Sequence, residues 1–215
     1  MDDETAETRP GTASATAARS VRRLTDPRAL RALAHPTRLA LIGLLRPDGP
    51  MTATRAGELL GESSASCSFH LRQLAKYGLV EEAGGGHGRE RPWQATTEFT
   101  AWPEASEDPD LAAAGDQLAA VLANRYFEHL LRWLDSKHLA PAPWQGAAHF
   151  GDTTLYVTAD ELTELGAQER ALVDRFAGRL GHPELRPPGA RPVTYLHLAF
   201  PGDVSGAAPS EDAAL

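Results

Sequence analysis

Two short helical segments joined by a tight turn account for Thr54–Tyr77, and this stretch constrains the fold more than any other. Thr54 is a candidate N-cap for the first segment, and Gly61 follows it where a left-handed residue can end a helix. The second segment begins at Ser63 or Ser64, because either hydroxyl can accept a hydrogen bond from the free amides of a first turn. The pattern predicts a helix-turn-helix.

The second helix has one narrow apolar stripe, formed by Cys67, Leu71 and Leu74. At about 100° per residue these positions share a face, which must pack inward. The opposite face combines small hydroxyls with longer hydrogen-bond donors, which suits a helix lying in the major groove of DNA. The residues we expect to enter the groove are Ser64, Ser66, Ser68, Phe69, Arg72 and Gln73. Arg55 and Lys76 are expected to contact phosphates.

A glycine-rich basic hairpin follows the second helix. Residues 79–83 and 92–96 are predicted strands, and the tip between them holds four glycines with Arg89 and Arg91. A P-loop is excluded, because no Gly-Lys-Ser/Thr follows these glycines and no helix begins after them. The hairpin is therefore interpreted as a wing whose arginines reach the minor groove or the flanking phosphates.

Together these segments resemble the winged helix-turn-helix domain of ArsR-type bacterial transcription regulators over residues 30–93. The resemblance rests on five segments that occur in order: Leu33–Leu39, Ala56–Leu60, Ser66–Leu74, Tyr77–Val80 and the arginine-rich wing. It implies a homodimer that binds an inverted-repeat operator on double-stranded DNA, usually as a repressor. Two-fold symmetry would place the half-sites about 10 base pairs apart, or a multiple of that.

The charge distribution agrees with DNA binding although the chain is acidic overall. Between Arg19 and Thr96 lie twelve Lys or Arg and seven Asp or Glu, so this segment carries +5 and the remainder carries −13. A local basic surface can attract phosphates while the acidic remainder limits non-specific binding. The opposite interpretation is a winged-helix module that contacts a protein partner through the acidic C-terminal part.

The rest of the chain predicts a mainly α (α+β) protein. The expected parts are a disordered tail (1–18), the winged helix-turn-helix domain (19–100), a long helix (108–138), an α/β unit (143–200) and a second disordered tail (201–215). In the α/β unit we expect a helix over 160–176 between strands at 153–158 and 193–200. Two strands and one helix bury too little surface to stand alone, so this unit is expected to pack on the long helix.

The long helix carries apolar residues at spacings of three and four over about four turns. Because a winged helix leaves little core for so long an apolar face, the face is expected to form a dimer interface, with help from the first helix of the domain. The interface residues expected are Leu30, Leu118, Val121, Leu122, Tyr126 and Leu130. C-terminal aromatic residues could instead line a pocket for a small organic effector, or could simply form the core of the α/β unit.

No metal, cofactor or catalytic site is predicted. The only cysteine, Cys67, has no second thiol, and His70 is its only nearby candidate co-ligand. An inward thiol with one basic neighbour gives weak grounds for a redox switch. No nucleophile elbow, HExxH or dinucleotide fingerprint occurs. A single cysteine, and the lack of a membrane-length apolar run or a secretory signal, favour a cytoplasmic protein.

Overall fold

The computed structural model describes residues 20–84, 91–103 and 105–202, and the chain within these ranges is mainly helical. The helices in chain order are α1 (Pro27–Leu33), α2 (Pro36–Asp48), α3 (Ala53–Leu60), α4 (Ser64–Lys76), α5 (Pro109–Ser136), α6 (Ala142–Ala147) and α7 (Ala159–Asp174). Three single-turn 3-10 helices, η1 (Lys137–Leu139), η2 (Ala177–Arg179) and η3 (Pro183–Leu185), complete the helical part. This confirms the mainly helical class predicted from the sequence. Both tails that were expected to be disordered lie almost wholly outside the described residues.

Two small sheets accompany the helices. The antiparallel pair β2 (Val80–Glu82) and β3 (Trp93–Ala95) forms the base of the predicted wing. The pair β1 (Val21–Arg23) and β4 (Phe99–Ala101) is parallel and was not predicted. Arg46 near the end of α2 connects this helix to β4 and the residues before it. Its guanidinium donates to the Thr97 carbonyl (3.2 Å) and to the Thr100 hydroxyl (2.7 Å). Burial of the guanidinium lowers the pKa of Arg46 to about 10.

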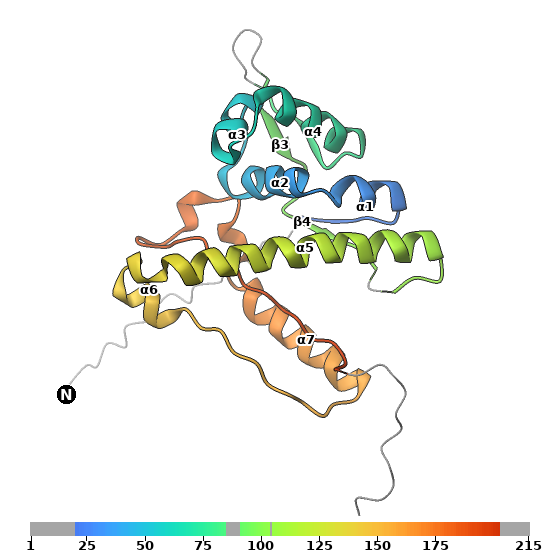
Figure 1. Ribbon diagram of the computed structural model, residues 1–215, viewed down its shortest axis with the longest axis vertical. Coiled ribbons are helices and arrows are strands. Elements are labelled where there is room, and N and C mark those ends of the chain that lie inside the picture. Colours follow the sequence, from blue (N-terminus) through green and yellow to red (C-terminus); the bar gives the residue numbers. More distant parts are fainter. Residues whose placement is uncertain (1–19, 85–90, 104, 203–215) are drawn as a thin grey trace, which may run out of the picture.

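The first four helices and β2 and β3 enclose one apolar core. The largest fully buried side chains in this part are Leu30, Leu41, Leu71, Leu74 and Val80, each at most 1% exposed. Leu71 and Leu74 belong to the stripe predicted for the second helix of the motif, and Cys67 is buried with them. The inward face of α4 is therefore the one predicted, and its opposite face points to the top of the molecule (Figure 1).

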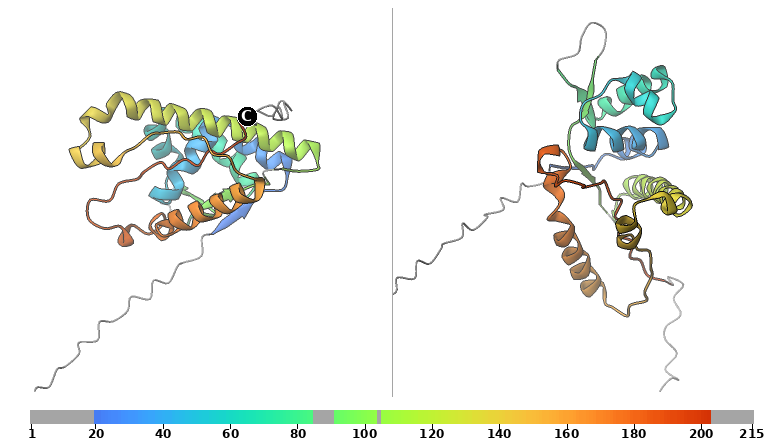
Figure 2. Two further views of the ribbon diagram at one scale, coloured as in Figure 1. Left: turned by 90° about the horizontal axis from the view of Figure 1, so that it is seen from below. Right: turned by 90° about the vertical axis from the view of Figure 1, so that its left-hand side faces the viewer.

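Helix α5 runs the full width of the molecule beneath this core and packs against α1. Asp108 caps its N-terminus by accepting from the amides of Asp110 and Leu111. Arg31 of α1 forms an ion pair with Asp110 in the first turn of α5. Viewed nearly along α5, the helix-turn-helix unit lies on one side of it and α7 on the other (Figure 2).

The C-terminal region has the predicted helix but not the predicted strands. Helix α7 begins with a complete capping box in which Thr158 and Glu161 satisfy each other's backbone amides. Residues 153–157 and 193–200 carry no strand, and the first of these segments is exposed throughout. A β-strand exists only with a hydrogen-bonded neighbour, and neither segment pairs with a partner in the described chain. Both segments therefore have no regular secondary structure.

Helix length and polarity also bear on membranes. No helix within the described ranges is both long enough and apolar enough to cross a bilayer.

Candidate nucleic-acid interface

Both helices of the motif are capped as their local sequence requires. Thr52 caps α3 by accepting from the Arg55 amide at 3.1 Å, so the cap lies two residues before the predicted Thr54. Gly61 ends α3 with φ +68°, a conformation that costs glycine nothing. Ser63 caps α4 by accepting from the Ser66 amide at 3.0 Å. The turn between the helices is thus held at both ends.

Close contact at Gly57 sets the angle between α3 and α4. The Gly57 carbonyl accepts from the Glu62 amide at 2.9 Å. A Cβ at position 57 would lie 2.7 Å from the Glu62 carbonyl oxygen and 3.3 Å from the Ser64 amide nitrogen. Only a residue without a side chain lets α3 approach the turn this closely, so Gly57 determines where the N-terminus of α4 lies.

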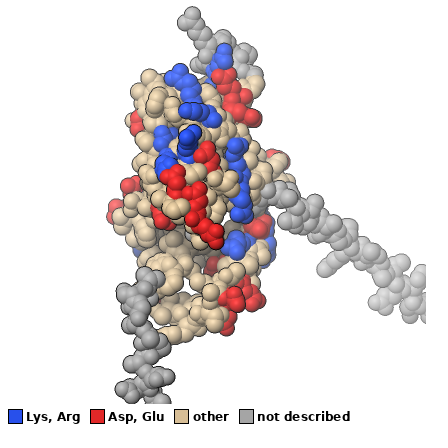
Figure 3. All heavy atoms as spheres, turned by 90° about the vertical axis from the view of Figure 1, so that its right-hand side faces the viewer, with Lys and Arg blue, Asp and Glu red and all other residues tan. Residues whose placement is uncertain are grey.

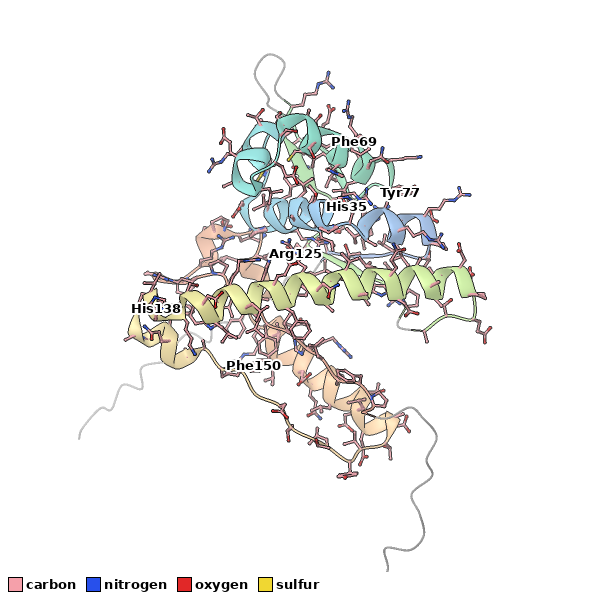
Figure 4. The ribbon with its side chains drawn as sticks, in the orientation of Figure 1. His35, Phe69, Tyr77, Arg125, His138 and Phe150 are labelled. Carbon is pink, nitrogen blue, oxygen red and sulfur yellow. The ribbon has the colours of Figure 1, made fainter. Side chains whose placement is uncertain are left out.

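The outward face of α4 presents the residues predicted to enter a major groove. Phe69 is 51% exposed and stands on the outer surface of the helix (Figure 4). Arg72 is exposed, and its Nε donates to the Ser68 carbonyl at 3.2 Å. The remaining members are exposed or half-buried along the same helix: Ser64, Ser66, Gln73 and Lys76.

The flanking arginines make only surface ion pairs. Arg55 pairs with Glu58 at 2.9 Å, and Arg91 pairs with Glu82 of β2 at 2.8 Å. Exposed pairs of this kind contribute about 0–1 kcal/mol, so a phosphate can replace the carboxylate at little cost. The second wing arginine, Arg89, lies outside the described residues.

Arg22 of β1 holds the other end of α4, and sequence reasoning missed it. Its two terminal nitrogens donate to the carbonyls of Gly78 (2.9 Å) and Tyr77 (3.0 Å). A cation near the C-terminus of a helix can take the hydrogen-bonding role of a cap for nearby carbonyls, and it interacts favourably with the negative end of the helix dipole. Arg22 lies 55 residues before Tyr77 in the chain, so no local pattern could have revealed the contact.

Two histidines, on α2 and α4, pack together next to the outward face of α4. His35 caps α2 by accepting from the Thr37 amide through Nδ1 (3.2 Å), and its ring lies 4.6 Å from that of His70 on α4. Burial, together with the charge of Arg38, lowers the pKa of both histidines. Both imidazoles are therefore mainly neutral near pH 7, because burial disfavours their charged forms.

The Cys67 thiol and the potential metal ligands of the described ranges are the groups that could form a redox or metal site. Burial raises the pKa of the Cys67 thiol, which disfavours the thiolate that redox chemistry requires. Nowhere in the described ranges do three or more His, Cys, Asp or Glu gather closely enough to hold a metal ion.

Part of the predicted dimer interface is used within the protomer. Leu30 and Leu118 are both 0% exposed, because α1 and α5 bury them against each other, so neither has surface left for a partner. Val121 and Leu122 also pack partly on the same core. Tyr126 and Leu130 are half-buried. The sequence did not reveal that α1 would pack on this face of α5, and the dimer interface itself stays a prediction.

A different apolar row remains on α5. Phe127 (47%), Leu131 (60%) and Leu134 (40%) are exposed at spacings of four and three. They share one side of the helix over two turns.

The C-terminal aromatics do not form the enclosed core or pocket weighed from the sequence. Phe150 is 76% exposed, Tyr156 100%, Phe176 54% and Tyr195 53%. Trp133 and Trp144 are half-buried.

Basic side chains occupy much of the upper part of the face that includes α1 and the end of α4, over the helix-turn-helix unit (Figure 3). Acidic side chains lie among them near the top and form a larger group below.

Comparison with known proteins agrees with this geometry. Residues 33–83 match a family model described as a helix-turn-helix domain. Because such domains bind DNA in transcription regulators, this one marks the chain as a DNA-binding transcription regulator. No curated protein matches the chain significantly.

Among solved structures, one described as a "Possible transcriptional regulator for arsenical resistance" is 28% identical over 51% of this chain and 95% of its own, with a TM-score of 0.29. Another, the heme sensor protein PefR in complex with heme and carbon monoxide, is 18% identical over 74% of this chain and 84% of its own, with a TM-score of 0.27.

Proposed function

We propose that this protein is a sequence-specific transcriptional repressor that reads a pseudo-palindromic operator as a homodimer. The observation that carries the proposal is the outward face of α4. It exposes an aromatic ring, an arginine and several short polar side chains on a helix anchored at one end by Gly57 and Ser63 and at the other by Arg22. A helix held this firmly presents its side chains to a groove with little loss of conformational entropy on binding.

We assign different roles to the side chains of this face according to their length. Ser64, Ser66 and Ser68 on the first turns let the helix backbone approach the base edges, while Arg72 and Gln73 are long enough to bond to them. Phe69 offers an apolar surface to a thymine methyl group. Arg55, Lys76 and the wing arginines Arg89 and Arg91 supply phosphate contacts, which set affinity and register rather than sequence choice.

The dimer forms, in this proposal, through the exposed row Phe127, Leu131 and Leu134 of α5, flanked by Tyr126 and Leu130. We expect a second copy of the chain to cover this face, because a two-fold axis between two α5 helices would pack the apolar row of one chain against the same row of the other. In such a dimer each α4 would serve one half-site, with the half-sites on successive turns of one face of DNA. Phe127→Ser together with Leu131→Ser should therefore yield a monomer in sedimentation experiments, with cooperative operator binding lost.

The function is tested by titrating the purified protein against DNA from upstream of its own gene and against a random duplex, over a series of salt concentrations. Specific binding should weaken linearly with salt on logarithmic axes, with a slope that counts the phosphate contacts. Arg72→Ala should lower affinity for the specific fragment by about 1–3 kcal/mol if the contact is to a base. Equal weakening on both duplexes would reject base reading by Arg72 and leave a phosphate contact.

A winged-helix module that contacts a protein is the second candidate. It is favoured by the apolar side chains left exposed beyond α5, such as Phe150 (76%) and Phe200 (77%), which could seat a partner. Failure of the purified chain to prefer any fragment at low salt would favour this candidate over the repressor. A small-molecule effector would instead be revealed as a ligand that loosens specific DNA binding.

A further inference from the structure

A shallow basic hollow lies where the end of α4 meets α1 and the start of α2. It has a volume of about 320 Å³, and its lining comprises Arg28, Arg31, Ala32, Arg38, Gln73 and Tyr77. Tyr77 lies at the junction of α4 and α1 in Figure 4. Three arginines therefore face one space beside the end of the proposed recognition helix.

Only one of these arginines is neutralised. Arg31 pairs with Asp110, and its pKa is raised by that hydrogen bond. Within the described ranges, no carboxylate pairs with Arg28 or with Arg38. The hollow thus holds two guanidinium groups that form no ion pair within the described ranges, and the Asp110 carboxylate interacts with Arg28 only at longer range.

Arg38 is also short of hydrogen bonds. Its Nε is buried with no acceptor in the described part of the chain, and Nη2 makes only a long contact of 3.4 Å to the Arg31 carbonyl. Burial lowers the pKa of Arg38, and the neighbouring Tyr77 opposes this only in part. An unsatisfied, partly buried guanidinium costs free energy that an oxyanion in the hollow would recover.

We propose that this hollow binds a phosphate group, with Arg28 and Arg38 as its charged donors. Guanidinium groups match phosphate oxygens in both charge and geometry. Gln73 and Tyr77 line the same space, and their amide and hydroxyl groups are neutral donors available to such a ligand. The volume accommodates a phosphate group and part of what it is attached to.

Two sources could supply this chemistry. One is a backbone phosphate of bound DNA, reached because Gln73 lies on α4 itself; this source rests on the proposed function. The other is a free phosphorylated molecule, which would bind without DNA and could signal to α4 through Gln73 and Tyr77.

The test uses the full chain, with Arg28→Gln and Arg38→Gln as variants. Arg132→Gln is the matched control, because Arg132 is an equally charged, exposed arginine on α5 that does not line the hollow. Inorganic phosphate and pyrophosphate are titrated by calorimetry at constant ionic strength. DNA affinity is measured over a salt series, and circular dichroism checks each fold. Arg28 is exposed and its side chain makes no bond within the described chain, so Arg28→Gln should fold even if Arg38→Gln does not.

For a free phosphorylated ligand, both variants should weaken phosphate or pyrophosphate binding by about tenfold or more, as for a lost charge-assisted hydrogen bond, while Arg132→Gln does not. For a DNA phosphate, each variant should reduce the salt slope by about 1 and leave the preference between duplexes unchanged. The proposal is overturned if Arg28→Gln, correctly folded, matches the control in both experiments. If the wild type binds no DNA specifically, the repressor proposal fails, and the calorimetric arm alone decides the phosphate site.

Discussion

Gly57→Ala provides a direct test of the packing that positions α4, the proposed recognition helix. Two effects oppose each other at this position. Replacing a mid-helix glycine with alanine stabilises a helix by about 1 kcal/mol. The new methyl group, however, would lie 2.7 Å from the Glu62 carbonyl oxygen. Real Cβ atoms do not approach backbone oxygens so closely, so the turn before α4 must move.

We expect the cost of the steric clash to exceed the gain in helix propensity. Overpacking of this kind typically costs about 1–3 kcal/mol, and the upper half of that range applies because backbone atoms cannot swing aside as a side chain can. After the gain in helix propensity is subtracted, the free energy of unfolding should fall by about 1–2 kcal/mol. Since the displaced turn carries Ser63, the cap of α4, specific DNA binding should weaken as well.

Gly43→Ala is the matched control, because Gly43 is also mid-helix, in α2, but exposed. Its added Cβ would meet only the flexible tip of Arg125 at 3.3 Å, so this variant should gain up to about 1 kcal/mol. Urea denaturation followed by circular dichroism measures both, with an unchanged slope showing that the unfolded state is not altered. If Gly57→Ala proves as stable as Gly43→Ala, the close approach of α3 to the turn does not constrain the fold, and the reasoning is refuted.

Further predictions concern the ends of α4 and the histidine pair behind it. Arg22→Met removes two charge-assisted hydrogen bonds to the C-terminal carbonyls of α4 and should lower the free energy of unfolding by about 2 kcal/mol in urea; a loss below 0.5 kcal/mol would contradict that role. Ser63→Ala should cost about 1 kcal/mol by the same measurement, whereas Ser63→Asp should restore most of it, because both Ser and Asp accept from the first-turn amides. The pKa values of His35 and His70 are lowered from their ordinary 6.5, so the unfolded chain binds more protons below that pH and stability should fall as pH drops through 6.5. Protonation of His35 also abolishes the acceptor that caps α2, and His70→Gln should flatten the acid slope; an equal slope in that variant would show that other groups cause it.

Local signals were sufficient to predict α3, α4, α5 and α7. Periodic apolar residues, capping hydroxyls and helix-ending glycines act within one or two turns, and a single sequence displays all of them. The inward face of α4 followed from Cys67, Leu71 and Leu74 for this reason, and so did the face opposite it. The candidate DNA-contacting residues within the described ranges are accordingly exposed or half-buried where the helical period placed them.

Contacts between distant segments could not be predicted in this way. The parallel pairing of β1 with β4 joins residues 78 positions apart, and the anchoring of α4 by Arg22 spans 55 or 56. Nothing near Arg22 in the sequence distinguishes it from neighbouring Arg23. The packing of α1 on α5, which buries Leu30 and Leu118, likewise depends on which of several apolar faces meet.

The strands predicted at 153–158 and 193–200, which the structure lacks, also show that local sequence cannot predict long-range pairing. Alternation of apolar and polar residues describes what a strand requires of its own side chains, but a strand also needs hydrogen bonds from a neighbour. The sequence by itself therefore determined the helices, their caps and the outward face of α4, all of which depend on short-range interactions. Only the tertiary structure decided what holds α4 in place, which surface of α5 stays free, and how Arg28 and Arg38 come to share one hollow, because each depends on segments far apart in the chain.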